Sequence, residues 1–274
     1  MAERSQIAFG SGRGAERYDE VLVPLIFDPW AEMLLETLPP EPGWDILDLA
    51  TGTGVVASKL AACQGEAGSL TAADISADML HVARARVGGA GAHATVSFVE
   101  TSAHPLQLED ASVDALYCQQ GFQFFPDGDA AAAEMHRVAK PGARIAISVW
   151  CSLAECKFFG SIAESLRQLG ETEAAGMIAT PFDHMPKAAL ESHFTSSGFD
   201  DVSIERVERE LVFEGGVEQA FETIYATPLA PRLQEFSAEK TAEFRTRFTA
   251  ESETWTRGGV AASPLAALVL TARK

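Results

Sequence analysis

Hydrophobic residues gather in short runs at regular intervals along the first half of the chain, and segments with helical spacing lie between those runs. This rhythm is typical of strands that alternate with helices. We predict strands at 45–50, 69–74, 94–99, 113–118 and 143–150, and helices at 54–64, 76–87 and 128–139. Such an alternation favours a parallel sheet that is covered by helices on both faces.

Residues at the ends of these segments carry capping and turn signals. In FDPWAEMLLETL an apolar stripe predicts a helix before the first strand, with Asp28 as its N-cap and Pro29 in its first turn. Ser76 is the expected cap of the helix at 76–87, and Pro141-Gly142 is the expected turn into the fifth strand.

The pattern changes after Trp150. Residues 152–198 have helical spacing, 202–213 alternate like a strand, 216–253 are again helical, and LAALVLTARK closes as a last strand. We expect the two helical insertions to form a cap over the carboxyl ends of the strands, where open α/β sheets bind ligands.

The predicted fold is a Rossmann-like, doubly wound sheet of seven mostly parallel strands, with an antiparallel last strand and a helical cap. We divide the chain into an N-terminal helical lid, a Rossmann-like core and two cap insertions, at 1–44, at 45–151 with 199–274, and at 152–198 with 214–258.

Charge and cysteine usage narrow the function classes. The formal net charge is −18, from 21 basic and 39 acidic residues, which disfavours nucleic acid and anionic lipid as partners. We expect a small neutral or cationic acceptor instead, and the sequence leaves the oligomeric state open, a homodimer included. Four scattered cysteines form no CxxC pair, so we expect reduced thiols and no metal site; they are Cys63, Cys118, Cys151 and Cys156.

The start of the chain has no apolar region typical of a secretion signal, and no run of about 18 apolar residues occurs. We therefore predict a cytoplasmic protein that does not span a membrane.

The stretch DILDLATGTGVVA, residues 45–57, predicts a strand, a tight glycine loop and a helix start, which together form a site for a nucleotide-like ligand. The loop satisfies GxGxxA, and Asp74 lies 20 residues beyond Gly54, where a carboxylate would accept hydrogen bonds from ribose hydroxyls. Asp48 would repel a pyrophosphate but would attract an ammonium and a sulfonium. This favours S-adenosylmethionine over a nicotinamide dinucleotide, and an NAD(P)-dependent oxidoreductase stays as the alternative.

Five ordered motifs carry a family resemblance. DILDLATGTG, AADIS, ETSAHPLQLED, SVDALYCQQGFQFFPD and RVAKPGARIAISVW resemble, in order and spacing, the motifs of class I S-adenosylmethionine-dependent methyltransferases of the small-molecule branch. The resemblance implies a cofactor site in which Asp48, Ala50, Thr51, Gly52 and Gln119 lie around the methionine moiety, Gly54 starts the helix, Asp74 binds the ribose, and Ile75, Met79, Ser102 and Ala103 lie around the adenine. Tyr18 would belong to a lid over the cofactor.

Two positions depart from the family pattern. Ala50 stands where many relatives have glycine, which is tolerable if its backbone dihedral angles are ordinary. Ser102 stands where many relatives have aspartate, so its contact with the adenine amino group would be weaker.

The resemblance implies methyl transfer from S-adenosylmethionine, with S-adenosylhomocysteine as the product, to an oxygen or nitrogen of a small molecule. Transfer to carbon is the alternative, because LDLATGTG is also similar to quinone-biosynthesis C-methyltransferases, whose N-terminal signature is missing here. His104 and His184 are the candidate bases, each weighed against a loop histidine that bonds to backbone, and Gln120 is a candidate for orienting a polar substrate.

Overall fold

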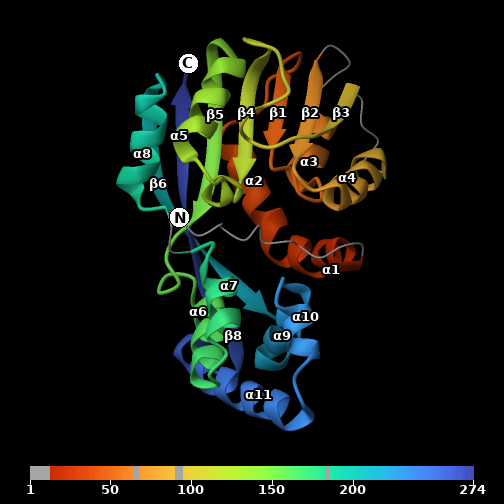
Figure 1. The fold of residues 1–274 in the computed structure, drawn as a ribbon, viewed down its shortest axis with the longest axis vertical. Helices are drawn as coiled ribbons and strands as arrows, with labels where there is room; N and C mark the ends of the chain where they lie inside the picture. The colour runs from red at the N-terminus through yellow and green to blue at the C-terminus, as the bar shows by residue number, and fades with distance from the viewer. Residues whose placement is uncertain (1–12, 64–67, 90–94, 183–184) are drawn as a thin grey trace. The chain divides into compact units, whose positions relative to one another are not determined.

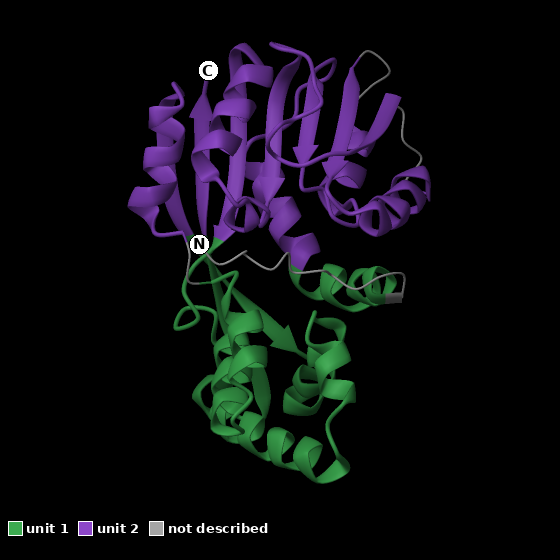
Figure 2. Ribbon diagram, viewed as in Figure 1, with its two compact units in different colours: residues 1–26, 150–184, 207–267 green, residues 27–149, 185–206, 268–274 purple. Residues whose placement is uncertain are grey.

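The computed structural model describes residues 13–63, 68–89, 95–182 and 185–274. The chain forms two compact units, which Figure 2 shows in green and purple. Unit 1 comprises Met1–Ile26, Trp150–His184 and Val207–Ala267, and unit 2 comprises Phe27–Val149, Met185–Arg206 and Leu268–Lys274.

The strands join in one sheet with the order β3-β2-β1-β4-β5-β8-β6, and a short eighth strand, β7, pairs with β8. The arrow of β8 points against those of β1, β2 and β4 (Figure 1). The predicted fold class is thereby confirmed. The strands are β1 (Asp45–Leu49), β2 (Ser69–Asp74), β3 (Thr95–Glu100), β4 (Val113–Gln119), β5 (Ala139–Trp150), β6 (Asp200–Phe213), β7 (Thr256–Arg257) and β8 (Val260–Arg273).

The centre of the sheet is β1, which pairs in parallel with β2 on one side and with β4 on the other. Its residues from Ile46 to Leu49 are buried, as is usual for a parallel strand that is covered on both faces. In this strand order the connections change direction between β1 and β4, and the carboxyl ends of these two strands are where open α/β sheets bind ligands.

Unit 2 holds two groups of helices beside the sheet. Helix α3 packs against α2 and against α4, and α5 packs against α8. Asp127 caps α5 by accepting a hydrogen bond from the Ala130 amide. Ser76 caps α4 through the Met79 amide, as predicted. These helices are α2 (Asp28–Thr37), α3 (Val55–Cys63), α4 (Ala77–Gly89), α5 (Gly128–Val138), α8 (Lys187–Ser196) and the short η2 (Phe122–Phe124).

Unit 1 is mostly helical and has an aromatic core. The ring of Phe158 lies 5.0 Å from those of Phe159 and Phe213, and it also contacts Phe248 and Trp255. The helices are α1 (Arg13–Leu22), α6 (Lys157–Gln168), α7 (Thr172–Ala179), α9 (Gly216–Thr223), α10 (Ala230–Gln234), α11 (Ala238–Ser252), η3 (Ile224–Ala226) and η4 (Glu253–Trp255), and η1 (Val23–Phe27) connects α1 to α2.

Two local predictions are wrong. Asp28 is not an N-cap, because α1, η1 and α2 follow one another without a break, and its carboxylate instead lies 3.0 Å from the Lys59 ammonium. Pro141-Gly142 is not a turn before the fifth strand but lies inside β5, where the register against β4 shifts between Val113 and Ala115. This bulge accommodates the proline, and Gly142 takes a φ of +85° there.

The units divide the chain at other places than the predicted lid, core and cap. Unit 2 includes α2 and α8, and the ring of Phe194 on α8 lies 5.2 Å from the ring of Phe122. The three-part division stays a prediction. Within the described ranges, no helix is both long and apolar enough to cross a membrane.

Candidate active site

The loop after β1 turns three times through left-handed backbone. Ala50, Gly52 and Gly54 have φ values of +57°, +57° and +82°. A Cβ on Gly54 would come within 2.9 Å of Ala83, so this glycine allows α3 to pack closely on α4. A Cβ on Gly52 would meet nothing within 4 Å, which leaves open space on the side of the loop where the methionine moiety is predicted.

Ala50 does not have the ordinary dihedral angles that its substitution for glycine was expected to require. A left-handed conformation costs an alanine about 1 to 2 kcal/mol relative to its usual backbone regions. The loop keeps this conformation because its ends are tied: the Thr51 amide donates to the Ala73 carbonyl at 3.0 Å, and the Gly54 amide donates to the Thr51 carbonyl at 2.9 Å.

Asp48 is the buried acid beneath this loop, with 1% of its surface exposed. The Thr51 hydroxyl donates a hydrogen bond to its carboxylate at 2.5 Å. Burial raises the pKa of Asp48 to about 7, despite that hydrogen bond. At neutral pH a carboxyl group in this state is only partly ionised, and the ammonium of an amino-acid ligand would favour its charged form.

Asp74, at the end of β2, binds the loop after β1 through its carboxylate. Its two carboxylate oxygens accept hydrogen bonds from the amides of Gly52, at 2.8 Å, and Ser76, at 2.9 Å. Burial raises the pKa of Asp74, and these amides oppose the shift. Each oxygen retains a lone pair for a ribose hydroxyl. The acid therefore holds the loop in place and keeps capacity for the predicted ribose.

Beside Asp74, Ile75 is a large apolar side chain with 57% of its surface exposed, whereas Met79 is buried. An exposed isoleucine next to the half-buried Asp74 suits the face of an aromatic base, because stacking would remove apolar surface from water. The role of Ile75 and Met79 beside the adenine stays a prediction.

The segment that follows β3 carries Ser102, Ala103 and His104. Ser102 donates its hydroxyl to the His104 carbonyl at 2.9 Å, so an adenine amino group would find it as an acceptor only. Ala103 is buried, and His104 is exposed.

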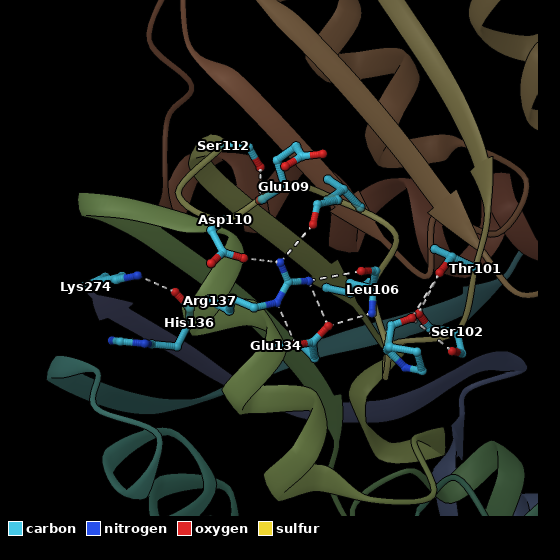
Figure 3. A network of polar contacts seen from close by, with 12 residues as sticks. Thr101, Ser102, Leu106, Glu109, Asp110, Ser112, Glu134, His136, Arg137 and Lys274 are labelled. Carbon is cyan, nitrogen blue, oxygen red and sulfur yellow. Dashed lines mark hydrogen bonds and ion pairs between the residues drawn. The ribbon is translucent and has the colours of Figure 1, made fainter.

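Arg137 holds the next part of this segment in a network that sequence analysis missed (Figure 3). Its guanidinium donates to both carboxylate oxygens of Glu134 and to the carbonyls of Leu106 and Leu108. Glu134 in turn accepts the Leu106 amide at 2.7 Å. Helix α5 thus fixes the segment that leads away from the predicted adenine contacts.

Replacing Arg137 with lysine should lower the free energy of unfolding by about 1 to 2 kcal/mol, because one ammonium cannot reproduce the planar set of hydrogen bonds. Urea denaturation of the two chains measures this difference. The matched control is Arg247→Lys, since Arg247 makes exposed ion-pair contacts with Glu243 on α11. Equal losses in both variants would contradict the role given to Arg137.

Three glutamines follow one another closely at the end of β4. Gln119 donates its amide hydrogen to the Phe27 carbonyl at 2.8 Å, so its nitrogen is committed to the segment before α2. Gln120 has a φ of +47°, and its side-chain oxygen accepts the Ser148 hydroxyl at 2.6 Å. Gln123 is buried in η2. Sequence analysis singled out Gln119 and Gln120, but it did not predict Ser148 as a partner.

Gly121 is a second residue that sequence analysis missed. A Cβ at this position would lie 2.5 Å from the Cβ of Ala50 and 2.9 Å from the sulfur of Cys118. The turn after β4 is thus pressed against the loop after β1. No motif signals this approach, because it joins residues from two strands that are far apart in the sequence.

Two predicted site residues lie apart from this arrangement. Tyr18 is in α1, which belongs to unit 1, and its place over the cofactor stays a prediction. His184 lies outside the described residues. The site residues from Asp48 to Gln123 all belong to unit 2.

The strand order, the glycine loop, the buried Asp48 and Asp74, which holds the loop, together fit a class I S-adenosylmethionine-dependent methyltransferase. The family can be stated more closely. The model of the ubiE/COQ5 methyltransferase family matches residues 14–163, and the chain belongs to this family. The predicted class and cofactor are confirmed, and the dinucleotide alternative is set aside.

Individual relatives agree with this assignment. A Brucella anthropi protein named ubiquinone/menaquinone biosynthesis C-methyltransferase UbiE is 39% identical over 117 residues, which cover 42% of this chain and 44% of the relative. A Shewanella piezotolerans protein of the same name is 35% identical over 136 residues, 48% of this chain and 54% of the relative. The chain spans about half the length of the curated relatives that it matches.

Among solved structures, phosphoethanolamine N-methyltransferase 2 of Haemonchus contortus, in complex with S-adenosyl-L-methionine, matches with a TM-score of 0.61 at 17% identity. The match covers 99% of this chain and 58% of that protein. At this identity the likeness shows the fold, and the acceptor must be argued from other observations.

Replacing Asp74 with asparagine should weaken binding of S-adenosylhomocysteine by about fivefold to tenfold, because the amide retains one acceptor oxygen but loses the second and the negative charge. Titration calorimetry checks this. Asp78→Asn, a change in the first turn of α4, is the control. Unchanged affinity in Asp74→Asn would contradict the ribose assignment.

Proposed function

We propose that this chain transfers the methyl group of S-adenosylmethionine to a carbon atom of an electron-rich, quinol-like ring. The observation that carries the proposal is the ubiE/COQ5 family match over residues 14–163, supported by relatives whose names specify C-methylation. Carbon therefore stands ahead of oxygen and nitrogen, which reverses the order that the sequence favoured.

S-adenosylmethionine would supply the methyl group as a good electrophile, and this chain's residues would bind and orient it. Asp48 would hold the ammonium group of its methionine moiety, Asp74 the ribose hydroxyls, and the open side of Gly52 would leave room for the methionine chain. Such an in-line displacement gains mainly from alignment and from the exclusion of water.

A ring carbon becomes a stronger nucleophile when a neighbouring phenol loses its proton. A base that accepts this proton would contribute about 10²- to 10⁴-fold to the rate. His104 and His184 both stay predictions as candidate bases. The cytoplasmic location and a homodimer also stay predictions.

The test uses S-adenosylmethionine with a ¹³C-labelled methyl group and three acceptors: a reduced 2-prenyl-1,4-naphthoquinol, a catechol and a primary amine. We expect a ¹³C methyl signal on a ring carbon of the naphthoquinol. A methoxy or N-methyl product would overturn carbon transfer while keeping the methyltransferase assignment. Calorimetry with S-adenosylhomocysteine, NAD and NADP, in parallel, checks the cofactor independently of any acceptor.

A further inference from the structure

The turn after β4 buries amide groups that find no partner within the described part of the chain. Gln120 and Gln123 have 5% and 4% of their surface exposed. The side-chain nitrogen of Gln120 and both polar atoms of Gln123 lack a hydrogen-bond partner among the described residues. An unsatisfied buried polar group typically costs about 1 to 3 kcal/mol, so the fold gains nothing from carrying three such atoms here.

The backbone of this turn is held firmly, although its side chains are unsatisfied. The Gln120 amide donates to the Ser148 carbonyl at 2.9 Å, and the Phe124 amide donates to the Gly121 carbonyl at 3.0 Å. The Ser148 hydroxyl also fixes the Gln120 side chain by donating to its oxygen. The free amide nitrogen of Gln120 is therefore positioned before any ligand arrives.

The turn lies next to the predicted methionine site. Gly121 approaches Ala50 so closely that no Cβ would fit between the two segments. Burial raises the pKa of the neighbouring Cys118 thiol, and the charges of Asp48 and Asp74 add to this shift, so both acids lie near the turn. The unsatisfied amides thus stand beside the site where the methyl group would be presented.

The chemistry of these groups selects the ligand. An anionic acceptor is usually bound by arginine or lysine, and here it would meet two acids. A cationic acceptor would be repelled by the sulfonium of the cofactor. Neutral amides pair well with hydroxyl groups, which both donate and accept hydrogen bonds, and with carbonyl oxygens, which accept them.

We propose that Gln120 and Gln123 bind the oxygen atoms of an uncharged hydroxyl- or carbonyl-bearing ring and thereby orient the acceptor. This inference rests on the proposed methyltransferase function and specifies the acceptor's chemistry. Gln120 donates to a ring oxygen, and Gln123 donates to or accepts from one. A phosphorylated acceptor is excluded by the same reasoning.

The test measures binding rather than turnover. Three probes are titrated into the chain saturated with S-adenosylhomocysteine: 1,4-dihydroxynaphthalene kept reduced, naphthalene, and phosphoethanolamine. We expect the diol to bind at least tenfold more tightly than either of the others. Gln123→Leu and Gln120→Leu should each weaken diol binding about tenfold, and should leave naphthalene and S-adenosylhomocysteine binding within about twofold.

Two further readouts separate this role from a structural one. Gln123→Leu should keep or raise the melting temperature, because it removes two unsatisfied buried atoms, whereas a structural glutamine would lose stability. The control Gln234→Leu changes an exposed glutamine on α10 and should alter none of these affinities.

The inference is overturned if wild-type chain binds the diol no better than naphthalene, if phosphoethanolamine binds best, or if both variants keep wild-type diol affinity. Tight diol binding without methyl transfer to carbon would refute the proposed function and leave the amide subsite standing.

Discussion

Raising the pH from 6 to 8 should tighten binding of S-adenosylhomocysteine by about tenfold, because Asp48 must be ionised to pair with the ligand's ammonium group. With a pKa of about 7, Asp48 is charged in about a tenth of the molecules at pH 6 and in about nine-tenths at pH 8. Asp48→Asn should remove this dependence and weaken binding at pH 8 by about 10². Calorimetry across this pH range gives both quantities.

The Asp48→Asn variant also controls for titration of the ligand itself. Any titration of S-adenosylhomocysteine itself would appear equally in both chains, so only the difference between them reports on Asp48. A pH dependence that survives in Asp48→Asn would assign the effect to another group. Equal affinity of the two chains at pH 8 would remove Asp48 from the methionine site.

Gly121→Ala should lower the free energy of unfolding by about 3 kcal/mol, because its Cβ would lie 2.5 Å from that of Ala50. Ala50→Gly alone should raise it by about 1 kcal/mol, since it relieves the left-handed strain. Combining the two should recover part of the loss, with the contact to Cys118 remaining. Urea denaturation of the four chains gives this coupling as a double-mutant cycle.

The coupling has a direct control. Gly88→Ala, on α4, introduces a Cβ that meets nothing within 4 Å and should show no coupling to Ala50→Gly. Strict additivity of Gly121→Ala and Ala50→Gly would show that the two segments do not touch in solution.

The sequence predicted the alternating half of the chain closely because each strand there is a short apolar run bounded by turn residues. The strand predicted at 69–74 and the helix predicted at 128–139 match β2 and α5 to within one residue. The bulge in β5 and the helix that continues through η1 could not be predicted from the sequence. Pro141 was interpreted as a turn because a proline rarely lies inside a strand. Asp28 was interpreted as a cap because η1 has no sequence signal of its own.

The candidate site likewise contains residues that the sequence could predict and contacts that it could not. Asp48, Gly52 and Asp74 stand in a motif whose spacing reflects one strand and its loop, so their proximity could be read from the sequence. The contact of Gly121 with Ala50, the bond of Ser148 to Gln120 and the network around Arg137 join residues that are distant in the sequence. Only the folded chain shows these.

Strand β1 carries an acid near each end, and the two respond oppositely to folding. Hydrogen bonds from Lys140 and Ser69 lower the pKa of Asp45, so its contribution to stability is lost as the solution becomes more acidic than that pKa. Burial raises the pKa of Asp48, so the free energy of unfolding falls by about 4 kcal/mol as the pH rises from about 4 to about 7. The ligand-free chain should be most stable in mildly acidic solution. At neutral pH the ammonium group of the bound cofactor would supply the positive charge that β1 itself lacks. The cofactor would therefore stabilise the folded chain as well as take part in the reaction.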